Sequence, residues 1–126
     1  MHRSRLAGFI IDCETADPSA AAQFWSAALG MPMTALPGEE GEKYVRLEPQ
    51  AMQLHVEVQA VSHASRVHLD IETDDIEAEV RRLERLGAKR LEFVHTWCVM
   101  LAPTGQKFCV VRASNPDFSS TAHHWD

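Results

Sequence analysis

The chain has 126 residues, of which 45% are hydrophobic and 24% charged, the composition of one globular domain with its own core. Its formal net charge of −6 repels a phosphate backbone, and no basic cluster with interleaved aromatic residues offsets this repulsion. We therefore expect no nucleic-acid partner, and no membrane partner either, because no apolar run approaches the roughly 18 residues of a membrane-spanning helix.

The N-terminal segment does not resemble a secretion signal. Residues 1–5 are basic, but the apolar stretch that follows is short and lacks a small-residue cleavage site. The three cysteines, Cys13, Cys98 and Cys109, are odd in number and far apart, which is typical of reduced thiols. We therefore expect a soluble protein of the cytoplasm.

The first predicted helix follows an alternating segment at residues 10–17. Asp17 is the expected N-cap and Pro18 the first helical residue, and Gly30 ends the helix. Its apolar residues recur at helical spacing: Ala21, Phe24, Trp25, Ala28 and Leu29. We expect Phe24 and Trp25 to pack between this helix and a sheet.

The second predicted helix has the sequence of a capping box, with Asp74 as the N-cap and Glu77 three residues later. Gly87 ends it. One face is apolar and carries Ile76, Val80, Leu83 and Leu86.

The two halves of the chain repeat one pattern. Residues 10–17 resemble residues 68–75, and each helix is followed by three candidate strands, at 31–35, 43–47 and 52–58, and at 90–95, 97–101 and 107–112. We predict an α+β fold of two βαβββ modules, 6–58 and 66–112, in one domain spanning 1–113. Residues 61–65 are the expected linker, and the tail, 114–126, is expected to be extended or frayed.

Alternation along the strands separates two faces. The face expected to pack under the helices carries Phe9, Ile11, Cys13, Met52, Leu54, Val56, Val58, Val67, Leu69, Ile71, Phe108 and Val110. The opposite face carries His55, Glu57, His68, Asp70, Glu72 and Cys109. Two interpretations stay open: this second face lines a cup, or it is the water-facing side of an antiparallel sheet.

Several side chains are candidates for work in such a cup. Tyr44, Met33 and Trp97 are either core residues or a wall on which a flat ligand stacks. Glu57, Asp70 or Glu72 is a candidate general base if the cup desolvates it; otherwise these carboxylates are simply solvated.

The order of these segments resembles the vicinal oxygen chelate superfamily, which includes glyoxalases, bleomycin-resistance proteins and extradiol dioxygenases, and in particular its glyoxalase-like domain proteins. The resemblance covers residues 6–112 and is carried by Phe24-Trp25, Ala28-Leu29-Gly30-Met31, Arg66-Val67-His68-Leu69-Asp70-Ile71, the helix end at 83–88 and the segment from Trp97 to Val110. It implies two βαβββ modules forming a curved mixed sheet around a central cavity that takes a small organic molecule. It also implies a homodimer.

Metal-using members of that superfamily hold the ion with one residue from each of the first, fourth, fifth and eighth strands. The resemblance places these positions at Ile10, His55, His68 and Cys109. Because Ile10 cannot coordinate a metal, we expect no metal cofactor. The alternative is a divalent ion such as zinc on His55, His68 and Cys109.

Three functions follow from this sequence. The first is a metal-free protein that binds a small organic molecule, either to sequester it as a resistance protein does or to convert it as a lyase or isomerase. Its catalytic groups would be His55, His68 and Glu57, with Tyr44, Asp70, Trp97 and Cys109 among the ligand-binding residues. The second is a metal-dependent lyase, isomerase or dioxygenase that uses the alternative ligand set. The third is an interaction domain without enzymatic activity, whose cavity is a relic.

Overall fold

The computed structural model describes residues 1–29, 31–48 and 54–126. The described residues form two compact units, Phe9–Val67 and Met1–Gly8 with His68–Asp126. Each unit contains a strand, a helix and three further strands, so the predicted α+β class and the repeated module are confirmed. Gly30 and residues 52–53 of the strand predicted at 52–58 lie outside the described residues. No helix in the described part of the chain has the length and apolar character to span a membrane.

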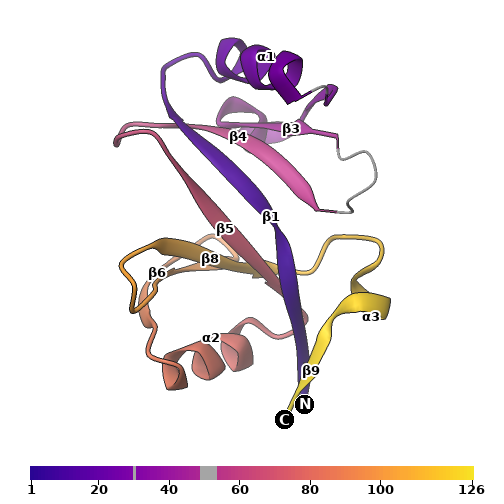
Figure 1. Ribbon diagram of the computed structural model, residues 1–126, viewed down its shortest axis with the longest axis vertical. Coiled ribbons are helices and arrows are strands. Elements are labelled where there is room, and N and C mark those ends of the chain that lie inside the picture. The colour runs from indigo at the N-terminus through magenta and orange to yellow at the C-terminus, as the bar shows by residue number, and fades with distance from the viewer. Residues whose placement is uncertain (30, 49–53) are drawn as a thin grey trace. The chain divides into compact units, whose positions relative to one another are not determined.

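In the unit Phe9–Val67, helix α1 packs on a four-stranded sheet (Figure 1). The helix is Pro18–Leu29, and the strands lie in the order β2 (Met33–Ala35), β3 (Tyr44–Leu47), β4 (His55–Val61) and β1 (His2–Glu14). Only the part of β1 from Phe9 onward belongs to this unit. Buried between them are Ala22, Val45, Leu47, Val56 and Val58, with Ile11, Cys13 and Trp25 packed against this cluster. The predicted packed face of β4 is therefore confirmed for the two valines. Phe24 is 64% exposed, so its predicted place in the core is wrong, because it lies on the outer side of α1.

The second unit repeats this arrangement around α2 (Ile76–Arg85). Its strands run in the order β5 (Arg66–Thr73), β8 (Lys107–Arg112), β7 (Trp97–Leu101) and β6 (Lys89–Val94). β5 belongs to this unit from His68 onward, and the start of β1 belongs to it as well. β5 and β8 are parallel, whereas the other two neighbouring pairs are antiparallel. The core under α2 consists of Val80, Leu83, Cys98, Met100 and Val110, with Ile71 and Phe108 beside it.

The ends of α2 differ in how well the sequence predicts them. The N-cap is Asp75, whose side chain accepts a hydrogen bond from the Ala78 amide, and not Asp74. Asp74 is unavailable because its carboxylate accepts hydrogen bonds from the backbone amide and the Nε of Arg3, at 2.8 and 2.9 Å. Gly87 ends the helix as predicted, with φ +107°, a conformation that favours glycine.

The faces of β5 depart from simple alternation. Val67 and Leu69, predicted to be packed, are 58% and 44% exposed, whereas Asp70 and Glu72 are buried. Glu72 is buried because Arg5 and the amides of Ser114 and Asn115 surround its carboxylate. Val67, Leu69 and Ile71 are all predicted to pack in the core. Of these three, only Ile71 packs against the core under α2.

The C-terminal tail is folded, which corrects the expectation of a frayed end. It forms the short helix α3 (Phe118–Thr121) and the strand β9 (His123–Trp125). β9 pairs antiparallel with the start of β1, so the two termini lie side by side (Figure 1). Trp125 donates a hydrogen bond from Nε1 to Ser4 Oγ at 3.0 Å, and its ring lies 4.0 Å from the guanidinium carbon of Arg82. A cation–π contact and a strand ladder thus hold the tail.

Candidate functional site

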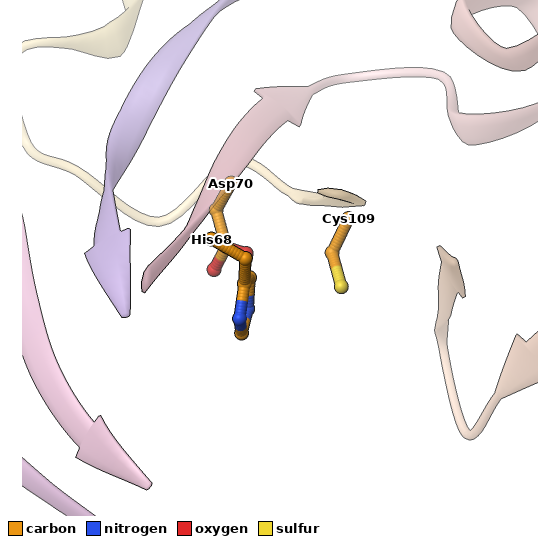
Figure 2. Close-up of side chains that lie close together, drawn as sticks. All are labelled: His68, Asp70 and Cys109. Atoms are coloured by element: carbon orange, nitrogen blue, oxygen red, sulfur yellow. The ribbon is translucent and has the colours of Figure 1, made fainter. Parts of the chain in front are cut away.

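Three side chains of β5 and β8 converge on one side of their sheet. His68, Asp70 and Cys109 each place one nitrogen, oxygen or sulfur atom so that these atoms lie within 4.8 Å of one another. Figure 2 shows the imidazole, the carboxylate and the thiol projecting to the same side of the strands. We refer to these three residues as the β5–β8 cluster.

Strand register explains why these residues meet. β5 and β8 are neighbouring parallel strands, and Asp70 is the direct partner of Cys109. His68 is two residues before Asp70, so both side chains lie on the same face of β5. His68 Nε2 and Asp70 Oδ1 are 3.5 Å apart, and the two side chains are 13% and 12% exposed. The cluster is therefore shielded from bulk water, which strengthens its electrostatic interactions.

An apolar surface borders the β5–β8 cluster. Val99 on β7 is the direct partner of Cys109 and shares its face. Trp97 and Val111 lie two residues along their strands on that same face, and all three are half-buried. A ligand at this place would meet polar groups on one side and an apolar wall on the other. Trp97 also contacts the His95 ring, with centroids 5.6 Å apart.

Four further positions from the sequence analysis, Ile10, Tyr44, His55 and Glu57, belong to the unit Phe9–Val67. Glu57 forms an ion pair with Arg46 at 3.1 Å. Tyr44 Oη accepts a hydrogen bond from Gln59 at 2.9 Å. His55 is 7% exposed, and Ile10, the family position without a ligand atom, is 2% exposed. The catalytic roles of His55 and Glu57, and the ligand-binding roles of His55 and Tyr44, remain predictions.

Glu72, a predicted candidate base, is buried and bound to residues of β1 and the C-terminal tail. Its side chain is 0% exposed, and its carboxylate pairs with Arg5 Nε at 3.1 Å. The carboxylate also accepts hydrogen bonds from the Ser114 and Asn115 amides at 2.8 and 3.1 Å, and from Asn115 Nδ2. These partners satisfy its acceptors, so Glu72 anchors the tail rather than serving as a base.

A second buried polar group joins the start of β1 to α2, and the sequence pattern did not indicate it. His2 Nε2 lies 2.8 Å from Glu79 Oε1, with the two side chains 6% and 0% exposed. Arg82 makes a bidentate contact with Glu79 at 2.8 and 2.9 Å. Burial alone would raise the pKa of Glu79, but the hydrogen bonds from Arg82, His2 and Ser4 outweigh burial and lower this pKa.

The three cysteines differ in their surroundings. Cys98 is 0% exposed within the core under α2, and burial raises the pKa of its thiol. Burial also raises the pKa of the Cys13 thiol, which packs against the core under α1. Cys109 is half-buried on the opposite face of its strand from the core residue Val110.

Known proteins share this architecture. A family model described as a glyoxalase-like domain matches residues 8–111. Methylmalonyl-CoA epimerase from Mycobacterium tuberculosis is 15% identical with a TM-score of 0.60, covering 92% of this chain and 91% of its own. A variant of the methylmalonyl-CoA epimerase from Streptomyces coelicolor, in complex with 2-nitronate-propionyl-CoA, is 13% identical with a TM-score of 0.56, covering 86% and 98%.

A glyoxalase/bleomycin resistance protein/dioxygenase superfamily member from Vibrio splendidus is 16% identical with a TM-score of 0.54, covering 87% of this chain and 99% of its own. At these identities the solved structures support the fold alone. No curated protein matches the chain. Because the family model spans most of the sequence, the chain belongs to the glyoxalase-like domain family of the vicinal oxygen chelate superfamily.

Proposed function

We propose that this protein binds a small organic molecule at the β5–β8 cluster and that His68 transfers a proton to or from it. One observation carries the proposal: an imidazole, a carboxylate and a thiol lie within 4.8 Å of one another in a shielded place. Such groups together rarely serve stability alone, since each costs free energy to remove from water.

The chemistry of the cluster suits a ligand with a carbonyl oxygen. His68 can donate a proton to such an oxygen, or accept one from the neighbouring carbon. Asp70, 3.5 Å from His68 Nε2, can stabilise the imidazolium that forms when the ring takes up a proton. Val99 and Trp97 would contact an apolar or aromatic part of the same ligand.

Thermal unfolding with a panel of aromatic and dicarbonyl compounds tests binding. A ligand at about 100 times its dissociation constant adds about 2.7 kcal/mol of stability, which raises Tm by about 10 °C for a domain of this size. We expect His68→Ala and Asp70→Asn to lose this shift. His63→Ala is the matched control, because His63 lies in an exposed loop and contacts only the neighbouring Ala64 carbonyl among the hydrogen bonds of the described residues.

Two results would contradict the proposal: no compound shifts Tm in the wild type, or His68→Ala responds as fully as His63→Ala. Mass analysis of a bound compound after incubation then separates the two forms of the proposal. An unchanged compound indicates sequestration, as in a resistance protein, whereas an isomer or a cleaved product indicates an isomerase or a lyase.

The donor set of the cluster favours a second candidate, a metal-dependent member of the superfamily. Nitrogen, carboxylate oxygen and sulfur are the donor types of zinc, and donor atoms around a tetrahedral zinc are about 3.3–3.8 Å apart. The spacing within the β5–β8 cluster, up to 4.8 Å, fits such an ion after a small adjustment of rotamers. His68, Asp70 and Cys109 would hold it, and Asp70 then supplies the donor that Ile10 lacks. A bound zinc ion polarises carbonyl oxygens and acidifies water.

Metal content after reconstitution with zinc and dialysis tests this second candidate. One zinc per chain in the wild type, lost in Asp70→Asn and retained in the surface variant Glu92→Gln, supports it. A resident zinc site binds its ion tightly. A wild-type protein that retains less than about a tenth of a zinc ion per chain therefore rules this candidate out.

A further inference from the structure

Cys109 has surroundings that neither of the other cysteines shares. Cys98 is fully buried among apolar side chains, and Cys13 packs against the core of the other unit. Cys109 is half-buried, and its sulfur lies within 4.8 Å of a ring nitrogen of His68 and a carboxylate oxygen of Asp70. A thiol, an imidazole and a carboxylate that lie this close together are the parts of an activated nucleophile, its base and the group that orients the base.

The positions of these three side chains also fit a nucleophile, a base and an orienting carboxylate. His68 Nε2 is 3.5 Å from Asp70 Oδ1, so one side of the ring is directed at the carboxylate. Contacts of this kind are often longer without substrate than in the reacting complex. The strands that carry these side chains are paired at this position, which holds the three groups on a rigid support.

We propose that Cys109 is a nucleophile that adds to electrophilic organic compounds, specifically α,β-unsaturated carbonyl compounds, with His68 as its base. The Cys109 sulfur forms a bond to the β-carbon while the thiol proton passes to His68. The electron pair of the broken carbon–carbon π bond moves toward the carbonyl as an enolate. His68 then returns the proton to the α-carbon, which leaves a thioether and a neutral ring. No electron is gained or lost overall, and no further reactant is consumed.

The surroundings of Cys109 suit this class of compound. Val99 and Trp97 offer an apolar wall for an unsaturated or aromatic chain, while the imidazolium formed on His68 attracts the enolate oxygen. The inference rests on the proposed function, because it assigns a ligand class and a covalent step to the same β5–β8 cluster.

N-Ethylmaleimide, a small α,β-unsaturated dicarbonyl compound, is the probe for the test. The protein is treated at neutral pH with EDTA present, so that no metal masks the thiol. Each cysteine-containing peptide is then quantified over time by mass spectrometry. We expect Cys109 to react at least about tenfold faster than Cys13. His68→Ala should slow Cys109 by about a hundredfold, the lower end of general-base effects. His63→Ala should leave the rate unchanged.

Labelling of Cys13 and Cys98 serves as an internal control for folding, because a loosened structure would expose both thiols and speed their reaction. The inference is overturned if Cys109 reacts no faster than Cys13, or if His68→Ala leaves the Cys109 rate unchanged while Cys13 and Cys98 stay slow. In that case a ligand-induced Tm shift that depends on His68 would still support the proposed binding function. If Cys109 is not labelled faster and no Tm shift depends on His68, both proposals are wrong.

Discussion

Replacement of Glu72 by glutamine should destabilise the protein strongly, although the two side chains have nearly the same shape. The Ser114 and Asn115 amides donate to Oε1. Asn115 Nδ2 donates to Oε2, which also forms the ion pair with Arg5 Nε. A glutamine can keep its oxygen toward one pair only, so its own NH₂ group faces donors on the other side. Breaking a buried ion pair costs about 3–5 kcal/mol. Arg5 keeps a second partner, Asp117, at 2.9 Å, so we expect about 3 kcal/mol, the lower end of that range.

Urea or thermal unfolding measures this loss, which corresponds to a decrease in Tm of about 10 °C for a domain of this size. Hydrogen exchange should also show faster exchange in β9, because Glu72 holds the start of the tail. Glu77→Gln is the matched control: that carboxylate is 45% exposed and pairs with Arg81 and Arg90 on the surface, so its loss costs at most about 1 kcal/mol. A Glu72→Gln protein as stable as Glu77→Gln would refute the anchoring role.

Three further substitutions test other contacts. Asp75→Ala removes the N-cap that accepts from the Ala78 amide and should cost about 1 kcal/mol in thermal unfolding; an unchanged Tm would argue against Asp75 as the cap. Trp125→Phe keeps an aromatic ring for the cation–π contact but loses the hydrogen bond to Ser4. The free energy of local opening of β9 should fall by about 1 kcal/mol, which hydrogen exchange measures as faster exchange in β9. Unchanged exchange there would show that this bond does not hold the tail. Glu79 has a folded-state pKa below its ordinary value of 4.5, so its contribution to stability is complete above that pH and is lost as the pH falls through the folded pKa. The stability gap between the wild type and Glu79→Gln should therefore shrink on acidification below about pH 4.5, and a gap independent of pH would contradict this reasoning.

Local sequence patterns were enough to predict the two modules and most of their elements. Helical spacing and local caps predicted α1 and the end of α2, because Asp17, Pro18 and Gly87 act through their own backbone neighbourhood. Alternation placed Val56, Val58 and Val110 in the cores and His68, Asp70 and Cys109 on a shared face. These are local periodic properties, which a single strand or helix already carries.

Long-range contacts, which appear only in the folded chain, set the places of several polar residues. Asp74 does not cap α2 because Arg3, 71 residues away in sequence, binds its carboxylate. Glu72 is an anchor because Arg5 and the tail enclose it, and the same contacts order a segment with no strong periodicity of its own. The register that sets Asp70 beside Cys109 likewise depends on the parallel pairing of β5 and β8. Ion pairs, buried hydrogen bonds and strand register join residues far apart in the chain, so no local pattern encodes their partners.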